Sequence, residues 1–243
     1  MKVYLTSSPT IMDWNVTPPK CVSFNPANGF LEHLKKDWKK NSKCLLISSA
    51  PDNIQMAEKM KAEFMELFPA NGFAIAAMDV CHNENIITSK TIASYDVIIL
   101  SGGHVPTQNA FFQKIGLKDM LTKYFSGIVI GISAGSMNSA DTVYAQPELE
   151  GESESPDYQR FLTGLGLTDI QIIPHWQYIK DQTLDGKRIL EDITLPDSKG
   201  NKFYALVDGS YLEIEDETTT LYGEAYLIEN GQITQICKEN EHR

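Results

Sequence analysis

The chain has 243 residues, 42% of them hydrophobic, and carries a formal net charge of −11. This length fits one α/β domain or two small ones, and the hydrophobic fraction supports a substantial buried core. The negative charge opposes the phosphate backbone of nucleic acids and anionic membrane surfaces, so we expect neither as a partner.

Membrane insertion and disulfide bonding are also disfavoured by the sequence. No apolar run approaches the length of about 20 residues that spans a bilayer, and residues 1–8 are typical of a first strand rather than of a signal peptide. The cysteines at 21, 44, 81 and 237 are far apart and form no C-x-x-C pair. The sequence therefore predicts a cytoplasmic protein with reduced cysteines and no metal or other cofactor.

Short apolar runs alternate with helix-length segments through the first half of the chain, which predicts a parallel sheet. The expected strands are residues 3–7, 43–49, 73–79, 96–101 and 127–132. The expected helices are residues 29–40, 51–68 and 107–125, the last with a break near Gly116. In the helix 51–68, a stripe with helical periodicity is predicted to face the core and consists of Ile54, Met56, Ala57, Met60, Phe64, Leu67 and Phe68.

The second half of the chain is richer in β-structure. An acidic segment at 144–168 is expected to form a surface loop near the site, followed by a strand at 170–173 and a helix at 187–193. The later strands are residues 203–207, 211–215, 221–229 and 232–237, with a type I′ turn at Asn230-Gly231. We therefore predict one three-layer α/β domain over residues 1–243, with a mostly parallel central sheet, helices on both faces and an antiparallel C-terminal β extension.

The segment 127–136 runs from an apolar strand directly into a G-x-S-x-G turn centred on Ser133. A hydroxyl becomes a useful nucleophile when a sharp strand-to-helix turn exposes it beside a base. Gly131 and Gly135 flank the serine, where larger side chains would crowd the turn. Ser133 is therefore a candidate nucleophile, and the alternative is an ordinary N-cap serine at the start of a helix.

His175 is the histidine best placed to act as the base. It follows the apolar run 169–174, so we expect it at the carboxyl end of a strand, on the same rim as Ser133. A lone histidine after a strand is also common as a structural residue. The other histidines of the chain are His33, His82, His104 and His242.

The carboxylate that orients the imidazole is predicted to be Asp208, which ends the strand 203–207. An aspartate before glycine is also a common turn residue, and Asp141 and Asp157 are rival candidates. The acidic loop carries further carboxylates that are expected only to solvate it, namely Glu148, Glu150, Glu152 and Glu154.

Backbone N–H groups for an oxyanion hole are expected from two places. One is Ala134, the residue after the candidate nucleophile. The other is the Ser-Gly-Gly-His segment 101–104, where paired glycines after a strand let the backbone approach a ligand closely. This segment also suits a β-to-α turn or a phosphate loop, but G-x-G-x-x-G and G-x-x-x-x-G-K-[ST] are absent, which disfavours nucleotide binding.

The chain order of the candidates separates two families of hydrolase. An α/β-hydrolase places its acid between serine and histidine, which leaves His175 or His242 as base, and His242 lies in a charged tail. The order Ser133, His175, Asp208 instead resembles peptidase family S51, the dipeptidase E and cyanophycinase group. The resemblance extends from residue 3 to residue 211 and rests on L-S-G-G at 100–103, G-I-S-A-G-S at 131–136, P-H at 174–175 and L-V-D-G-S-Y-L at 206–212.

The resemblance implies a class I glutamine amidotransferase-like fold and hydrolysis of a short peptide or related amide through an acyl-enzyme. It implies Ser133 as nucleophile, His175 as general base and acid, and Asp208 as orienting carboxylate, where dipeptidase E carries Glu. Gly103 and Ala134 would form the oxyanion hole. The expected partner is a small peptide, with N-terminal Asp as one candidate, and assembly into a homo-oligomer stays open.

Two departures from the family bear on substrate binding. Dipeptidase E has Asn-Thr-Phe directly after the paired glycines, whereas His104 opens a longer insertion before Phe111 here. The Asp-selective members use an arginine after the histidine segment, where this chain has Asp185, with Lys187 and Arg188 just beyond. His104 and Arg188 are therefore the candidate substrate contacts, although a helix-surface role suits the arginine equally well.

The alternative function is a non-catalytic small-molecule binding or regulatory protein with the same fold. The altered loop after the paired glycines motivates it. An amidotransferase is disfavoured because its usual thiolate chemistry needs a cysteine at the elbow, where this chain has serine.

Overall fold

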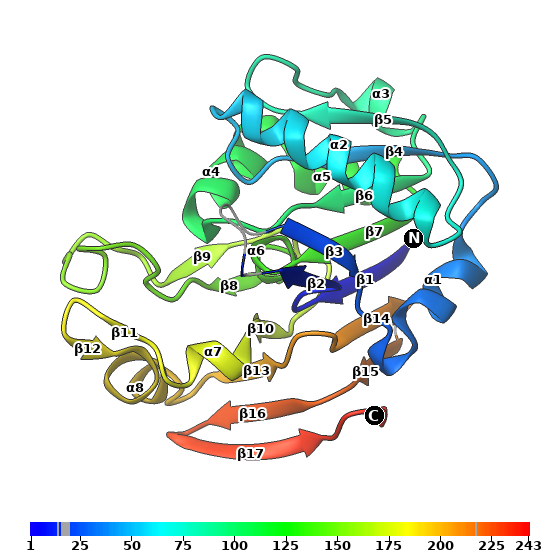
Figure 1. Ribbon diagram of the computed structural model, residues 1–243. Coiled ribbons are helices and arrows are strands. Elements are labelled where there is room, and N and C mark those ends of the chain that lie inside the picture. The colour runs from blue at the N-terminus through cyan, green and yellow to red at the C-terminus, as the bar shows by residue number, and fades with distance from the viewer. Residues whose placement is uncertain (14, 16–19, 217) are drawn as a thin grey trace.

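The central sheet has seven strands in the order β15-β14-β1-β7-β6-β4-β5 (Figure 1). The computed structural model describes residues 1–13, 15, 20–216 and 218–243. In chain order the strands are β1 Lys2–Thr6, β4 Ser42–Ile47, β5 Ile75–Cys81, β6 Val97–Leu100, β7 Ile128–Ile132, β14 Tyr211–Glu215 and β15 Thr218–Tyr222. The first five pair in parallel, and β14 and β15 extend the sheet in the antiparallel direction. The predicted mostly parallel α/β architecture is confirmed.

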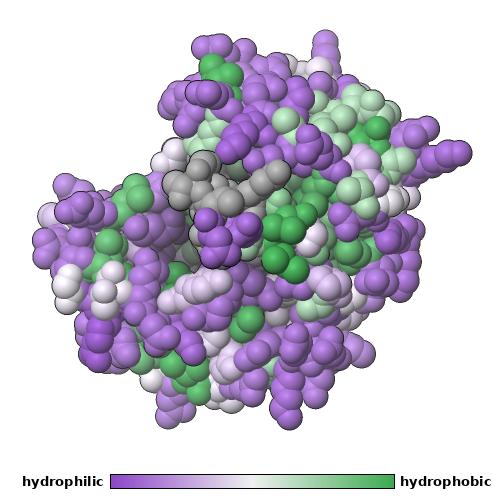
Figure 2. Space-filling view, viewed as in Figure 1, coloured by the Kyte–Doolittle hydropathy of each residue, from purple (hydrophilic) through white to green (hydrophobic). Residues whose placement is uncertain are grey.

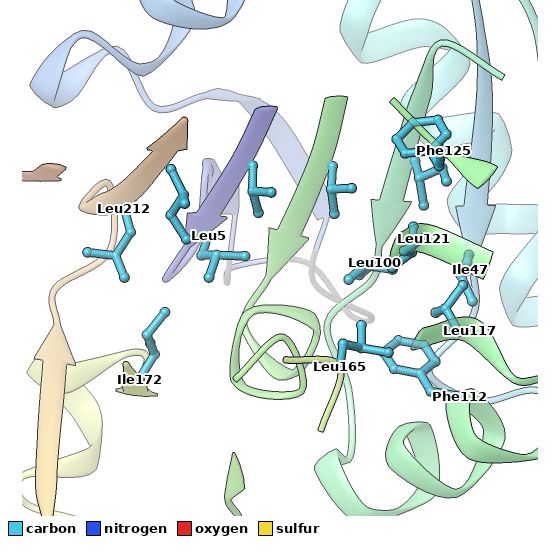
Figure 3. Packing of buried hydrophobic residues seen from close by; sticks show 14 of the residues in the cluster. Leu5, Ile47, Leu100, Phe112, Leu117, Leu121, Phe125, Leu165, Ile172 and Leu212 are labelled. Atoms are coloured by element: carbon cyan, nitrogen blue, oxygen red, sulfur yellow. The ribbon is translucent and has the colours of Figure 1, made fainter. Parts of the chain in front are cut away.

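Helices cover both faces of this sheet (Figure 1). Because side chains alternate along a strand, Tyr4 and Leu5 of β1 join different hydrophobic clusters. The cluster of Tyr4 packs against α1 and α2, and the cluster of Leu5, shown in Figure 3, packs against α3, α4 and α5. The helices are α1 Phe30–Asp37, α2 Ile54–Ala70, α3 Ser89–Ile92, α4 Val105–Ile115, α5 Leu117–Tyr124, α6 Ala134–Met137, α7 Trp176–Ile179 and α8 Leu195–Asp197.

Local sequence explains where the two best predicted helices begin and break. Asn53 caps α2, and its side-chain oxygen accepts a hydrogen bond from the Met56 N–H at 3.0 Å. Met56 was predicted to face the core but is 44% exposed, because it lies off the buried face of the helix. The predicted break separates α4 from α5 at Gly116, whose φ of 67° suits glycine. The buried part of the predicted stripe consists of Ala57, Phe64, Leu67 and Phe68.

The C-terminal β extension forms a second sheet in the order β10-β13-β16-β17. Its strands are β10 Gln171–Ile173, β13 Lys202–Leu206, β16 Ala225–Glu229 and β17 Gln232–Cys237. Asn230 and Gly231 have φ values of 53° and 77°, and a type I′ turn requires positive φ at both residues. The chain crosses from this sheet to the central sheet between β13 and β14 (Figure 1).

Several short elements differ from the predictions. The strand predicted at 221–229 divides at Gly223, whose φ of 88° opens the turn between β15 and β16. The helix predicted at 187–193 is a short strand followed by the π-helix Ile189–Thr194. Runs this short carry too little periodicity to be predicted. Three two-stranded sheets were not predicted, namely β2 Thr10–Asp13 with β3 Lys20–Phe24, β8 Thr142–Tyr144 with β9 Phe161–Thr163, and β11 Thr183–Leu184 with β12 Lys187–Arg188.

The surface is mostly hydrophilic in this view, with hydrophobic side chains gathered near its centre (Figure 2). The pair β2 and β3 contributes exposed apolar side chains, because Ile11 is 44% and Val22 is 61% exposed. No helix within the described residues combines the length and the hydrophobicity needed to cross a bilayer.

Candidate active site

Ser133 lies in a strained turn between β7 and α6. Its φ of 49° and ψ of −111° are unusual for a residue with a side chain, and such strain is typical of functional turns. A Cβ on Gly131 would approach the Cα of Ser136 to 2.9 Å, and one on Gly135 would collide with the Leu100 carbonyl. The Ser133 side chain makes no helix-capping hydrogen bond, so the N-cap interpretation is not supported. The turn has the strand-to-helix context of a nucleophile elbow.

His175 lies directly against this serine. The distance from its Nε2 to Ser133 Oγ is 2.9 Å, and the distance from its Nδ1 to Asp208 Oδ1 is 2.7 Å. Both distances are hydrogen-bond distances. The residue has a left-handed backbone, with φ of 56° and ψ of 35°, which turns the chain from β10 into α7. The structure therefore brings together the three residues predicted as nucleophile, base and acid.

The environment of Asp208 keeps its carboxylate ionised. Burial alone would raise the pKa of Asp208, but the hydrogen bond and charge of His175, with further hydrogen bonds from Ser7 and Gln177, outweigh burial and lower that pKa. An ionised carboxylate accepts the Nδ1–H of the imidazole, which leaves Nε2 free to accept the serine proton. Neither rival acid competes for this place, because Asp141 pairs with Lys118 on the surface and Asp157 is exposed.

Ser7 links the acid Asp208 to the backbone of His175. Its hydroxyl donates to Asp208 Oδ1 at 2.7 Å and accepts the backbone N–H of His175, also at 2.7 Å. Ser7 follows β1, the strand that pairs with β7 and with β14. We did not predict this residue from the sequence, because its place beside the site depends on the order of the strands.

The loop after β6 has the geometry of an oxyanion-binding segment. Ser49 Oγ donates to the Gly102 carbonyl at 2.5 Å. In a trans peptide the carbonyl and the next N–H point in opposite directions, so the Gly103 N–H is turned away from Ser49. Gly103 has a φ of 153°, and a Cβ there would collide with the Ser49 hydroxyl. Within the described residues, the N–H groups of Gly103 and Ala134 donate no hydrogen bond to another protein group, and Gly103 lines the cavity described below.

A buried group of side-chain amides supports this loop and the turn from behind. Gln108 Nε2 donates to the Ser101 carbonyl at 2.7 Å, and Asn138 Nδ2 donates to Gln108 Oε1 at 3.0 Å. Asn109 Nδ2 donates to Asn138 Oδ1 at 2.9 Å. Gln108, Asn109 and Asn138, here called the amide network, are at most 8% exposed. They join α4 to the residue after α6 and so fix the loop of Gly103 relative to the turn of Ala134.

A cavity of about 510 Å³ opens beside Ser133, His175 and Gly103. Met60, Phe64 and Leu67 of α2, here called the apolar wall, line one side of it. Met12 of β2 and Cys21 of β3 line it from another side. The predicted core stripe of α2 therefore has a second role that its helical period does not reveal.

The structure brings neither predicted substrate contact to this cavity. His104 is bonded to Thr107 and to Glu152, the latter through Nε2 at 2.8 Å, and Arg188 pairs with Asp192 at 2.9 Å. The arginine side chain is 59% exposed and lies on the surface, at the end of β12 rather than on a helix. Neither residue is among those that line the cavity.

The acidic loop is held in place by specific contacts rather than only solvated. Asp185 accepts the N–H groups of Gly151 and Ser153, at 3.0 and 3.2 Å. Glu152 accepts the N–H of Glu148 at 2.9 Å. Burial and the neighbouring Glu152 raise the pKa of Glu148 to about 7. The expectation that these two glutamates are merely solvated is wrong, because the loop folds back against the segment of His104.

The fold and the site together define a serine-type hydrolase. The family model described as peptidase family S51 matches residues 23–222. The chain therefore belongs to peptidase family S51 and is a serine-type peptidase. Within the described residues, no group of three or more His, Cys, Asp or Glu side chains is arranged to hold a metal ion.

Two solved structures share the fold. The crystal structure of a peptidase from an acI-B1 Actinobacterium matches with a TM-score of 0.61 and 17% identity, covering 100% of this chain and 96% of that one. A putative peptidase E protein from Listeria monocytogenes EGD-e matches with a TM-score of 0.58 and 12% identity, covering 97% of this chain and 98% of that one. No curated protein matches the sequence.

Proposed function

We propose that the protein hydrolyses short peptides through an acyl-enzyme formed on Ser133. The observation that carries this proposal is the chain of contacts from Ser133 Oγ through the imidazole of His175 to Asp208, with distances of 2.9 and 2.7 Å. A serine within hydrogen-bond reach of an oriented imidazole is the arrangement that activates the hydroxyl. The adjoining cavity gives the peptide a place to bind.

Each group then has a defined task in the proposed reaction. His175 Nε2 takes the proton of Ser133 as the hydroxyl oxygen attacks the scissile carbonyl, and Asp208 stabilises the imidazolium that forms. The N–H groups of Gly103 and Ala134 donate to the oxyanion. The imidazolium passes its proton to the leaving amine, and the same imidazole then activates the water that hydrolyses the ester.

A preference for N-terminal Asp is not part of the proposal. Such a preference needs a cation to meet the substrate carboxylate. Among the residues whose side chains the structure describes, no Lys or Arg lines the cavity, and Arg188 lies elsewhere, paired with Asp192. The proposed substrate class is therefore a short peptide, without a requirement for an acidic residue.

We also propose a cytoplasmic location. The four cysteines carry free thiols, and three of them, Cys44, Cys81 and Cys237, are buried. Free thiols suit a reducing compartment.

The short distance between Ser133 and His175 favours catalysis over the alternative of a non-catalytic binding protein. A binding protein that does not use the serine has no need for the pair to lie within hydrogen-bond reach. The strained backbone of Ser133 also favours catalysis, because backbone strain of this kind clusters at active sites.

The test combines a covalent probe with a peptide panel. A fluorophosphonate should label the wild-type protein and Ser126→Ala, whose serine is exposed outside the site, but not Ser133→Ala. Hydrolysis of short peptides should disappear in the same variant, with kcat lower by about 10,000-fold or more. Labelling and hydrolysis that persist in Ser133→Ala, or are absent from the wild type, would refute the proposal.

A further inference from the structure

Several apolar side chains line the cavity beside Ser133. Met60, Phe64 and Leu67 project from one stripe of α2, and both Phe64 and Leu67 are 8% exposed. Ile132, just before the serine, and Ile179 of α7 add further apolar surface. Binding is favoured when an apolar group of the ligand replaces water against a surface of this kind. Methionine adapts to side chains of different shape because it is flexible and polarizable.

The reacting groups open into the same cavity. Ser133, His175 and the oxyanion segment at Gly103 all line it. A peptide whose scissile carbonyl lies between Ser133 and Gly103 therefore has its neighbouring side chains in the same cavity as the apolar wall.

Among the side chains that the structure describes, the carboxylates that line the cavity carry negative charge and no Lys or Arg lines it. Apart from Asp208, which is engaged with His175, the charged side chain that lines the cavity within the described residues is Glu63. Its neighbour Lys59 is 3.9 Å away on the solvent side of α2, is 58% exposed, and does not line the cavity. An exposed pair at this distance is weak and screened by salt, so Glu63 keeps its negative field toward the cavity.

We propose that this cavity selects peptides with an apolar residue on the acyl side of the scissile bond, and that Glu63 rejects those with an acidic residue there. This inference rests on the proposed peptidase function. The binding of a leucine, methionine or phenylalanine side chain is stabilised by its burial against the apolar wall. A carboxylate loses its hydration there and is repelled by Glu63.

The experiment uses aminoacyl-7-amido-4-methylcoumarins, which share one leaving group and differ only in the acyl residue. For the wild-type enzyme we expect kcat/KM for the leucine, methionine and phenylalanine substrates to exceed that for aspartate by about 100-fold or more. The asparagine substrate should fall between them, because it is polar but uncharged. Aminoalkyl diphenyl phosphonates of leucine and aspartate measure the same preference as rates of serine labelling, without any leaving amine.

A charge reversal tests the role of Glu63. Glu63→Lys should raise the ratio of aspartate to leucine turnover by at least about tenfold, since it replaces repulsion by attraction. Glu66→Lys is the matched control, because Glu66 lies on the same helix, is exposed, and does not line the cavity. It should leave the ratio unchanged.

The outcomes separate the inference from the function on which it rests. Equal rates for leucine and aspartate, or an unchanged ratio in Glu63→Lys, in an enzyme whose Ser133 still reacts with a fluorophosphonate, would overturn the inference alone. Loss of that labelling in the wild type would overturn the proposed function and the inference with it.

Discussion

The two sides of Ser133 are built in opposite ways. Behind the serine, the amide network is buried and its members bond one another and the backbone. In front of it, the apolar wall lines an open cavity and offers no directional contact. Catalysis needs donors and acceptors at fixed positions, which buried hydrogen bonds provide. Recognition of an apolar side chain needs only shape and hydrophobicity. We therefore expect the hydrogen-bonded groups, namely the catalytic residues and the amide network, here called the polar side, to control kcat. The apolar wall should control KM.

The largest effect on the polar side should come from Asp208→Asn. An amide at this position no longer holds the imidazole in the productive tautomer, so kcat should fall by roughly 1,000- to 10,000-fold while KM changes little. Steady-state kinetics on a short peptide with an apolar acyl residue measures both. Asp157→Asn, which changes an exposed acid, is the control. A loss in kcat of less than tenfold would show that Asp208 does not orient the base.

A matched pair of substitutions compares the two sides directly. Asn138→Leu leaves buried partners in Gln108 and Asn109 unsatisfied, so the free energy of unfolding should fall by about 2 to 4 kcal/mol and kcat by about tenfold. Met60→Leu conserves volume on the wall and should cost less than about 1.5 kcal/mol, changing KM only. Urea denaturation and steady-state kinetics test both. Equal losses of stability would remove the proposed distinction.

Ser49→Ala tests the oxyanion segment without touching the nucleophile. The Ser49 hydroxyl orients the peptide between Gly102 and Gly103, so its loss should lower kcat by about tenfold with KM unchanged. Gly103→Ala should be more damaging, because its Cβ collides with Ser49. A rise in KM with constant kcat in Ser49→Ala would instead indicate a role in binding.

The smallest predicted effect is a change in how stability depends on pH. The pKa of Glu148 is raised from 4.5 to about 7, so its proton stabilises the fold fully below pH 4.5, and that stabilisation is lost as the pH rises through 7. Glu148→Gln should remove this pH-dependent loss of stability, because the amide does not titrate. Between pH 5 and pH 8, the unfolding free energy of the variant minus that of the wild type should therefore rise. Because Glu148 is half-buried, we expect a rise of only about 1 to 2 kcal/mol.

Urea denaturation at the two pH values measures this difference, with the exposed Glu150→Gln as control. The same pH dependence in Glu148→Gln and in the wild type would show that the glutamate titrates normally.

The polar side could be predicted from the sequence more fully than the wall. Ser133, His175 and Asp208 each follow an apolar run, and the carboxyl ends of strands meet at one rim of an α/β sheet, so the three could be placed together. Ser7 could not, because its contact with Asp208 depends on β14 lying beside β1. Strand order is a long-range property that local patterns do not contain.

The wall illustrates a different limit. Met60, Phe64 and Leu67 were predicted as core from their helical period, and Phe64 and Leu67 are indeed buried. A stripe that packs on a sheet has the same period whether or not part of it also borders a cavity. The cavity depends on β2 and β3, whose strands are too short to give a periodic signal. Substrate selection was therefore the part of the site least visible in the sequence.

The position of Asp208 between the two sheets has a consequence for a newly made chain. The turn that carries Ser133 is built from strands that leave the ribosome early, whereas Asp208 is fixed only when β14 pairs with β1. On the proposed mechanism, a nascent chain that ends before β14 holds a nucleophile with no oriented base. On that mechanism, full hydrolytic activity therefore requires the pairing of β14 with β1, which comes late in the synthesis of the chain.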